Sequence, residues 1–180
     1  MSDLKIVSLL LGAVFLIAGA VAFIRPQAVR SLLKAFPRNK AAGWVLTAIC
    51  IAWAGWLVYK MPLGGFERYK NLVYLLIPVS FFMIITYMGE LLAARALGGF
   101  LMLVPYPMLL AAQFHPSEFR YVIIIMAYAM VIKGMLLTLS PYLFRRFMNP
   151  VCNNDNTLKF VSGVWVVFGI ILLALGLIEF

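Results

Sequence analysis

The chain has 180 residues and a formal net charge of +9; 65% of its residues are hydrophobic, only 12% are charged, and its mean hydropathy is +1.03. So little polar surface excludes a soluble monomer, whereas a bilayer accepts apolar helix faces directly. The cations lie in the gaps between apolar runs, where they face anionic headgroups rather than nucleic acid. We therefore expect a membrane protein with no nucleic-acid partner, and a single integral membrane domain over residues 1–180.

Six apolar runs, each bounded by charged or turn residues, predict an all-α fold. Each run approaches the roughly 20 residues that cross the hydrocarbon core of a bilayer. The sequence therefore predicts a polytopic transmembrane helix bundle of about six spans. The runs are residues 4–24, 41–59, 72–88, 91–114, 121–140 and 160–178.

The first run ends in Ala20-Val21-Ala22, which imitates a signal-peptidase site. Its N-terminal flank carries one acid and one base, so it lacks the usual positive bias of a signal peptide. Cleavage would also export the cationic segment that follows, against the positive-inside rule. We expect an uncleaved first span.

The segment after the first run carries five cations and no acidic residue. We expect these side chains to contact anionic lipid headgroups, each contributing about 1 kcal/mol near a negatively charged surface. The five are Arg25, Arg30, Lys34, Arg38 and Lys40.

The same segment predicts a short amphipathic helix between Pro26 and Pro37. A proline suits the first helical turn, where its missing N–H costs nothing, and a second proline stops the helix. Apolar residues recur between them at the i, i+3, i+4, i+7 spacing of one helical face, so we expect this helix to lie on the cytoplasmic membrane surface. The apolar positions are Val29, Leu32, Leu33 and Phe36.

A shift of 115 residues indicates a second copy of this pattern after the fifth span. It pairs Gly19 with Gly134, Pro26 with Pro141 and Arg30 with Arg145, and the second copy ends at a proline, Pro150. We expect a second surface helix there, with Arg145 and Arg146 at the headgroups, and a parallel structural repeat relating residues 12–57 to 127–178. With three identities, chance is the alternative explanation.

The fourth run is interrupted by Pro105-Tyr106-Pro107. Each proline removes a backbone donor and clashes with the preceding turn, so we expect this helix to kink or break there. Lipid does not satisfy freed carbonyl groups, and neighbouring helices must therefore cover the break.

Three charges lie at or within membrane depth, namely Glu90, Arg95 and Lys133. Such residues are costly in hydrocarbon and usually face a bundle interior, a cavity or a partner, which makes them candidate functional residues. The alternative for Glu90 and Arg95 is that they form a polar cap of the connection between spans three and four. Lys133 lies seven residues before Ser140, roughly 10 Å deep, so it either snorkels to headgroups, pairs with Glu90, or serves a substrate or proton.

Charge asymmetry predicts the orientation. Nine cations fall in the first, third and fifth connections or at their edges, against five at the other ends of the spans. The positive-inside rule then puts both termini outside the cytoplasm, and we expect the bacterial inner membrane.

Catalytic and ligand-binding signatures are sparse. The chain has a single histidine, His115, in a turn before the fifth span, and its two cysteines, Cys50 and Cys152, do not form a disulfide framework. We expect no metal, no cofactor and no catalysis. The favoured function is an accessory or scaffolding subunit bound to other membrane protein subunits, and the alternative is a small solute or ion transporter or channel that uses Lys133 and the proline-broken fourth helix.

Overall fold

The computed structural model describes residues 3–62, 64, 68, 70–87, 91–113 and 116–178. In this part of the chain the secondary structure is helical, without strands. The long helices are α1 (Asp3–Ile24), α3 (Lys40–Lys60), α4 (Lys70–Tyr87), α7 (Arg120–Leu139) and α9 (Asp155–Ile178), and the consecutive helices α5 (Leu92–Leu103) and α6 (Pro105–Gln113) together form a segment of similar length. The others are α2 (Pro26–Ala35), the 3₁₀ helix η1 (Phe36–Arg38) and α8 (Tyr142–Asn153).

Five helical segments of the described chain are long and apolar enough to cross a membrane, and the all-α fold is thereby confirmed. Four of them match expected spans closely, and α9 begins five residues earlier than expected. The expected third span corresponds to α4, whose apolar part, Tyr74–Tyr87, is shorter than the other five. The five segments are Leu4–Ile24, Lys40–Lys60, Leu92–Gln113, Arg120–Leu139 and Asp155–Ile178.

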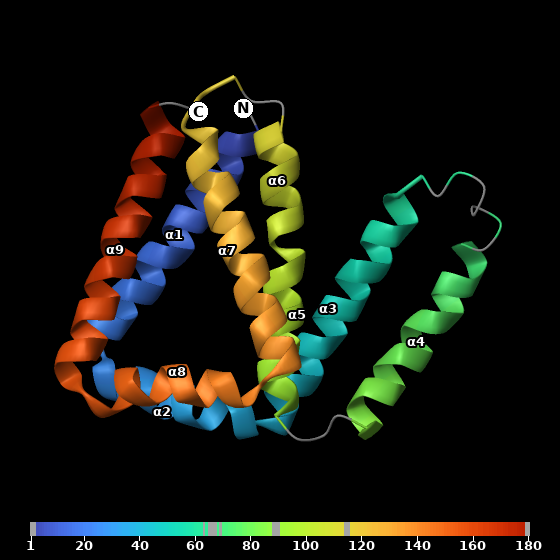
Figure 1. The fold of residues 1–180 in the computed structure, drawn as a ribbon, viewed down its shortest axis with the longest axis horizontal. Coiled ribbons are helices and arrows are strands. Elements are labelled where there is room, and N and C mark those ends of the chain that lie inside the picture. Colours follow the sequence, from blue (N-terminus) through green and yellow to red (C-terminus); the bar gives the residue numbers. More distant parts are fainter. Residues whose placement is uncertain are drawn as a thin grey trace.

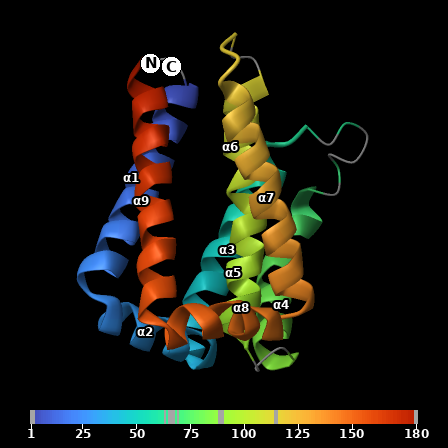
Figure 2. The same ribbon diagram turned by 60° about the vertical axis from the view of Figure 1, so that its left-hand side comes forward.

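The long helices stand between two distinct ends of the molecule (Figure 1). At one end α2 and α8 lie side by side, crosswise to the long helices, and we call this the α2/α8 end. At the opposite end, called here the terminal end, α1 begins and α9 ends. Figure 2 shows α1 beside α9 and α6 beside α7. In Figure 1, α4 lies outermost and packs on α3.

The pair of α1 and α9 has the most extensive helix contact, and small residues permit it. A Cβ atom on Gly169 would lie 2.7 Å from the backbone nitrogen of Leu16 and 3.0 Å from the Gly12 carbonyl oxygen. The buried Ser8 hydroxyl donates a 2.7 Å hydrogen bond to the Leu172 carbonyl of the facing helix. Close backbone approach and interhelical hydrogen bonds are what hold helices together in lipid, where apolar burial drives little association.

The apolar core lies toward the terminal end, where α1, α6, α7 and α9 meet. Its buried residues are Leu4, Met108, Ala112, Ile123, Met126, Ala127 and Leu172.

The predicted break in the fourth span is confirmed at Val104. α5 ends at Leu103 and α6 begins at Pro105, whose side chain is fully buried. α6 packs against α7 and α1, which cover the break as the bilayer requires.

The prediction that Pro150 ends the second crosswise helix is wrong. The backbone stays helical through Pro150, and α8 continues to Asn153. A proline removes one backbone donor, but the last turn of α8 is anchored by Cys152, which is 3% exposed.

Candidate anion site between the crosswise helices

The two crosswise helices, α2 and α8, carry cations at the α2/α8 end. α2 begins at Pro26 and is followed by η1 around Pro37, so both prolines act where the sequence predicts. The rings of Phe36 and Phe144 lie 5.9 Å apart and join the two helices. The expected apolar face is only partly buried, because Leu32 is 67% exposed.

One cation of α2 is bound within the protein. Arg30 forms a salt bridge with Asp155 in the first turn of α9, which ties α2 to the start of the last span. Its side chain is 21% exposed, and its buried Nε atom has no hydrogen-bond partner. Arg30 is thus the least accessible to headgroups of the described cations on α2 and η1.

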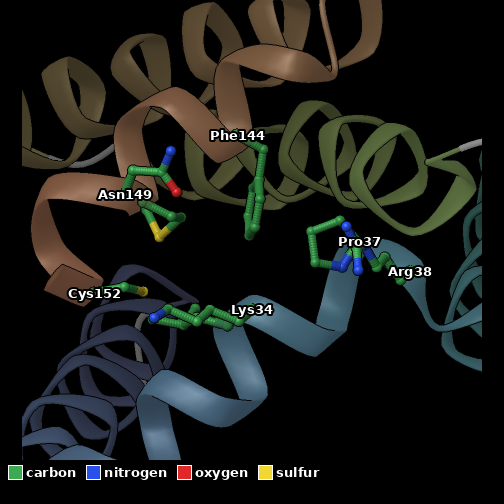
Figure 3. A pocket seen from close by; sticks show the side chains of 8 residues that line it. Lys34, Pro37, Arg38, Phe144, Asn149 and Cys152 are labelled. Carbon is green, nitrogen blue, oxygen red and sulfur yellow. The ribbon is translucent and has the colours of Figure 1, made fainter.

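A pocket of about 300 Å³ lies at this end of the molecule. One wall is formed by α2 and η1, and the opposite wall is formed by α8. In Figure 3 the Phe144 ring points from α8 toward α2, and the Lys34 side chain runs along α2 toward Cys152. The lining residues are Leu33, Lys34, Pro37, Arg38, Phe144, Met148, Asn149 and Cys152.

Two of the five predicted cations line this pocket. Lys34 lies in the last turn of α2 and Arg38 ends η1 four residues later, and both are exposed. Arg25 and Lys40 are exposed at the same end of the bundle but do not line the pocket. The lining therefore offers two cations for an anion.

The second crosswise helix contributes polar and apolar groups rather than charge. Phe144, Met148 and Cys152 follow at four-residue spacing and form the inward face of α8. Arg146 is exposed and does not line the pocket, and the side chain of Arg145 lies outside the described part of the structure.

Of the three membrane-depth charges, the structure describes two. Arg95 lies in the second turn of α5; it is partly buried and its Nε atom has no hydrogen-bond partner. Lys133 is exposed on α7, and no described carboxylate forms a salt bridge with it.

Glu90 lies outside the described residues, so its pairing with Lys133 stays a prediction. α4 packs on α3, α3 on α5 and α5 on α7, so α3 and α5 lie between the two helices that the pair would join.

The pocket was not evident from the sequence, because its walls come from segments about 115 residues apart. Asn149 and Cys152 gave no signal by themselves. The four-residue spacing of Phe144, Met148 and Cys152 was a usable signal of the pocket, because residues at this spacing share one face of a helix.

The fold defines an all-α protein with five helices able to cross a membrane, the architecture of an integral membrane protein. Comparison with protein-family models, curated proteins and solved structures finds no match to this chain. Within the described residues, no group of three or more histidine, cysteine or acidic side chains has an arrangement that would hold a metal ion.

Proposed function

We propose that the chain is a six-span protein of the bacterial inner membrane that acts without catalysis, as an accessory or scaffolding subunit of a larger membrane complex. α4 is the sixth span. It has 18 residues, about 27 Å of helix, and it joins the terminal end, where α3 finishes, to the α2/α8 end, where α5 begins. An even number of crossings follows, with both ends of the described chain on one side.

The α2/α8 end is proposed to face the cytoplasm. The cations of α2, η1 and α8 gather there, and positively charged connections favour the cytoplasmic side. At the terminal end, Lys60 lies 4.1 Å from the centre of the Trp56 ring, and Tyr59 contacts Tyr74 at 6.1 Å between ring centres. An aromatic belt of this kind suits the outer interface.

The observation that carries the subunit proposal is the exposed surface of the chain, 11676 Å². A compact protein of 20.2 kDa exposes roughly 8,800 Å², so this chain exposes about a third more. The surplus, about 2,900 Å² on this chain alone, is at least as large as the roughly 1,000–2,500 Å² that one partner contributes to an obligate interface. We assign it to contact with another membrane protein.

α4 is the element best placed for that contact. Its main packing partner is α3, through Ile77 against Gly55. Its other faces are open, with Leu75 63% exposed, Phe82 73% and Tyr87 82%. A helix held by one neighbour is the natural docking element for a partner span.

The transporter or channel alternative is supported by the break at Val104, because broken helices line transport sites. It also requires Lys133 to reach an internal path, and the exposure of Lys133 on α7 favours the subunit proposal instead.

A photo-crosslinking amino acid at Phe82 tests the proposal in native membranes. We expect ultraviolet light to give one discrete product that contains this chain and a different polypeptide, identified by mass spectrometry. The matched control is the same amino acid at Phe160 of α9, which is also aromatic and is 74% exposed. The control is expected to give lipid adducts alone.

Lipid adducts alone at Phe82, together with a monomer after extraction in mild detergent, would contradict the subunit proposal. A product of two copies of this chain would replace a heteromeric complex by a homo-oligomer.

A further inference from the structure

The pocket between α2 and α8 combines features that recognise a phosphate group. Lys34 of α2 and Arg38 of η1 supply two cations on one wall, and Asn149 supplies an amide on the opposite wall. No acidic residue is among the eight that line it. Phosphate oxygens accept charge-assisted hydrogen bonds from ammonium and guanidinium groups, so this charge pattern selects an anion over a cation or a neutral solute.

The neighbouring acid does not cancel this charge. Asp155 at the start of α9 is held by Arg30, which does not line the pocket. Lys34 and Arg38 therefore keep their charge available for a ligand. The other exposed cations at this end, including Arg146 and Lys159, add to the positive field that draws anions toward it.

The rest of the lining is apolar. Leu33, Phe144 and Met148 form a surface that a free, fully hydrated phosphate would not contact, but that the glycerol backbone and the first methylenes of a lipid would. A volume of about 300 Å³ is at the lower end of small-molecule sites and suits a headgroup rather than a whole lipid.

We propose that this pocket binds the phosphate group of one anionic phospholipid, with Lys34 and Arg38 on the phosphate oxygens and the Asn149 amide donating from α8. The ligand then joins the two crosswise helices, as the contact of Phe36 with Phe144 does within the protein. The proposal rests on the proposed function, in which the α2/α8 end lies at the cytoplasmic face of the membrane. It is independent of α4, so the crosslinking result at Phe82 and the lipid result can fail separately.

Native mass spectrometry of the detergent-solubilised chain tests the proposal. Wild-type protein is titrated with phosphatidylglycerol, with phosphatidylcholine, and with glycerol 3-phosphate as the soluble form of the same phosphate chemistry. We expect one bound phosphatidylglycerol per chain, at least about tenfold tighter than phosphatidylcholine, and no comparable binding of glycerol 3-phosphate.

The double variant Lys34→Gln/Arg38→Gln should weaken phosphatidylglycerol binding by about 30-fold, the combined effect of two cations near an anionic headgroup. The matched control, Lys40→Gln/Lys159→Gln, removes the same charge from two exposed residues that do not line the pocket. It should stay within about threefold of wild type, because diffuse attraction is screened.

A variant that leaves the charge of the pocket unchanged tests whether the lipid binds inside the pocket. Asn149→Trp fills the pocket from an exposed position on α8 while both cations remain. We expect it to abolish phosphatidylglycerol binding without lowering the melting temperature by more than a few degrees, a criterion that separates occlusion from unfolding.

Three results would overturn the proposal. Equal losses in the two double variants would mean diffuse attraction and no site. Undiminished binding by Asn149→Trp would place the lipid elsewhere. Binding of glycerol 3-phosphate as tight as that of the lipid would assign the pocket to a soluble phosphate ester.

Discussion

Lys133 is the one charge in the interior of its span, and its exposure on α7 favours snorkelling among the interpretations that the sequence left open. It lies six residues before Leu139, about 9 Å of helix from the α2/α8 end, a distance that a lysine side chain largely covers by snorkelling. We predict that Lys133→Met changes the stability of the protein in detergent by less than about 0.5 kcal/mol, as for other exposed side chains. Thermal melts followed by circular dichroism measure this.

The control for charge removal is Lys159→Met, an exposed lysine in the second turn of α9. Glu90→Gln and the Lys133→Met/Glu90→Gln double variant complete a cycle. Independent sites give additive changes in stability. If the stability change of the double variant differs from the sum of the two single changes, the ion pair between spans three and five is established and snorkelling is refuted.

At the scale of elements, the pairing of α1 with α9 depends on glycine. We predict that Gly169→Ala lowers stability by about 1–3 kcal/mol, the usual cost of overpacking. The added methyl group would meet backbone atoms of Leu16 and Gly12 at 2.7 and 3.0 Å, so the two helices must move apart. The melting temperature in detergent should fall accordingly.

Gly163→Ala is the matched control on the same helix. A Cβ atom at this position meets nothing within 4 Å, so the substitution should leave the melting temperature unchanged or raise it slightly through better helix propensity. Equal losses from Gly163→Ala and Gly169→Ala would mean that an added methyl group lowers stability wherever it lies on α9, and would refute the close contact with α1 as the cause.

The helical elements were largely predictable because their causes are local. Runs of apolar residues set the five candidate spans, and prolines set the start of α2 and the break at Val104. The start of α9 at Asp155 was missed although its signal was present, since the Asn154 side chain caps the Asn156 amide and an acid suits the first turn.

The candidate site was predictable only in part, because its causes are not local. A cluster of cations is visible in the sequence, so the headgroup-facing segment could be named. Which cations line a pocket depends on how α2 meets α8: Lys34 and Arg38 line it, whereas Arg30 reaches Asp155 across 125 residues of sequence. Such pairings follow from tertiary packing, and no spacing rule indicates them.

At the scale of the whole molecule, the proposed orientation needs a better reporter than the native thiols. Cys152 is 3% exposed and Cys50 is buried within α3, so neither reacts freely with an aqueous reagent. Asn156 is exposed at the α2/α8 end, and Met61, 47% exposed, directly follows α3 at the opposite end. A cysteine at either position, in a chain with Cys50→Ala and Cys152→Ala, reports one side of the membrane.

We predict that a membrane-impermeant thiol reagent added to intact cells labels Met61→Cys and leaves Asn156→Cys unlabelled. Once the membrane is permeabilised, both variants should react, which shows that Asn156→Cys is accessible from the cytoplasm. The reason is the concentration of cations on α2, η1 and α8, which favours retention of that end on the cytoplasmic side. Labelling of Asn156→Cys alone in intact cells would invert the orientation. Labelling of both would refute the three crossings by α4, α5–α6 and α7 that separate the two reporters along the chain.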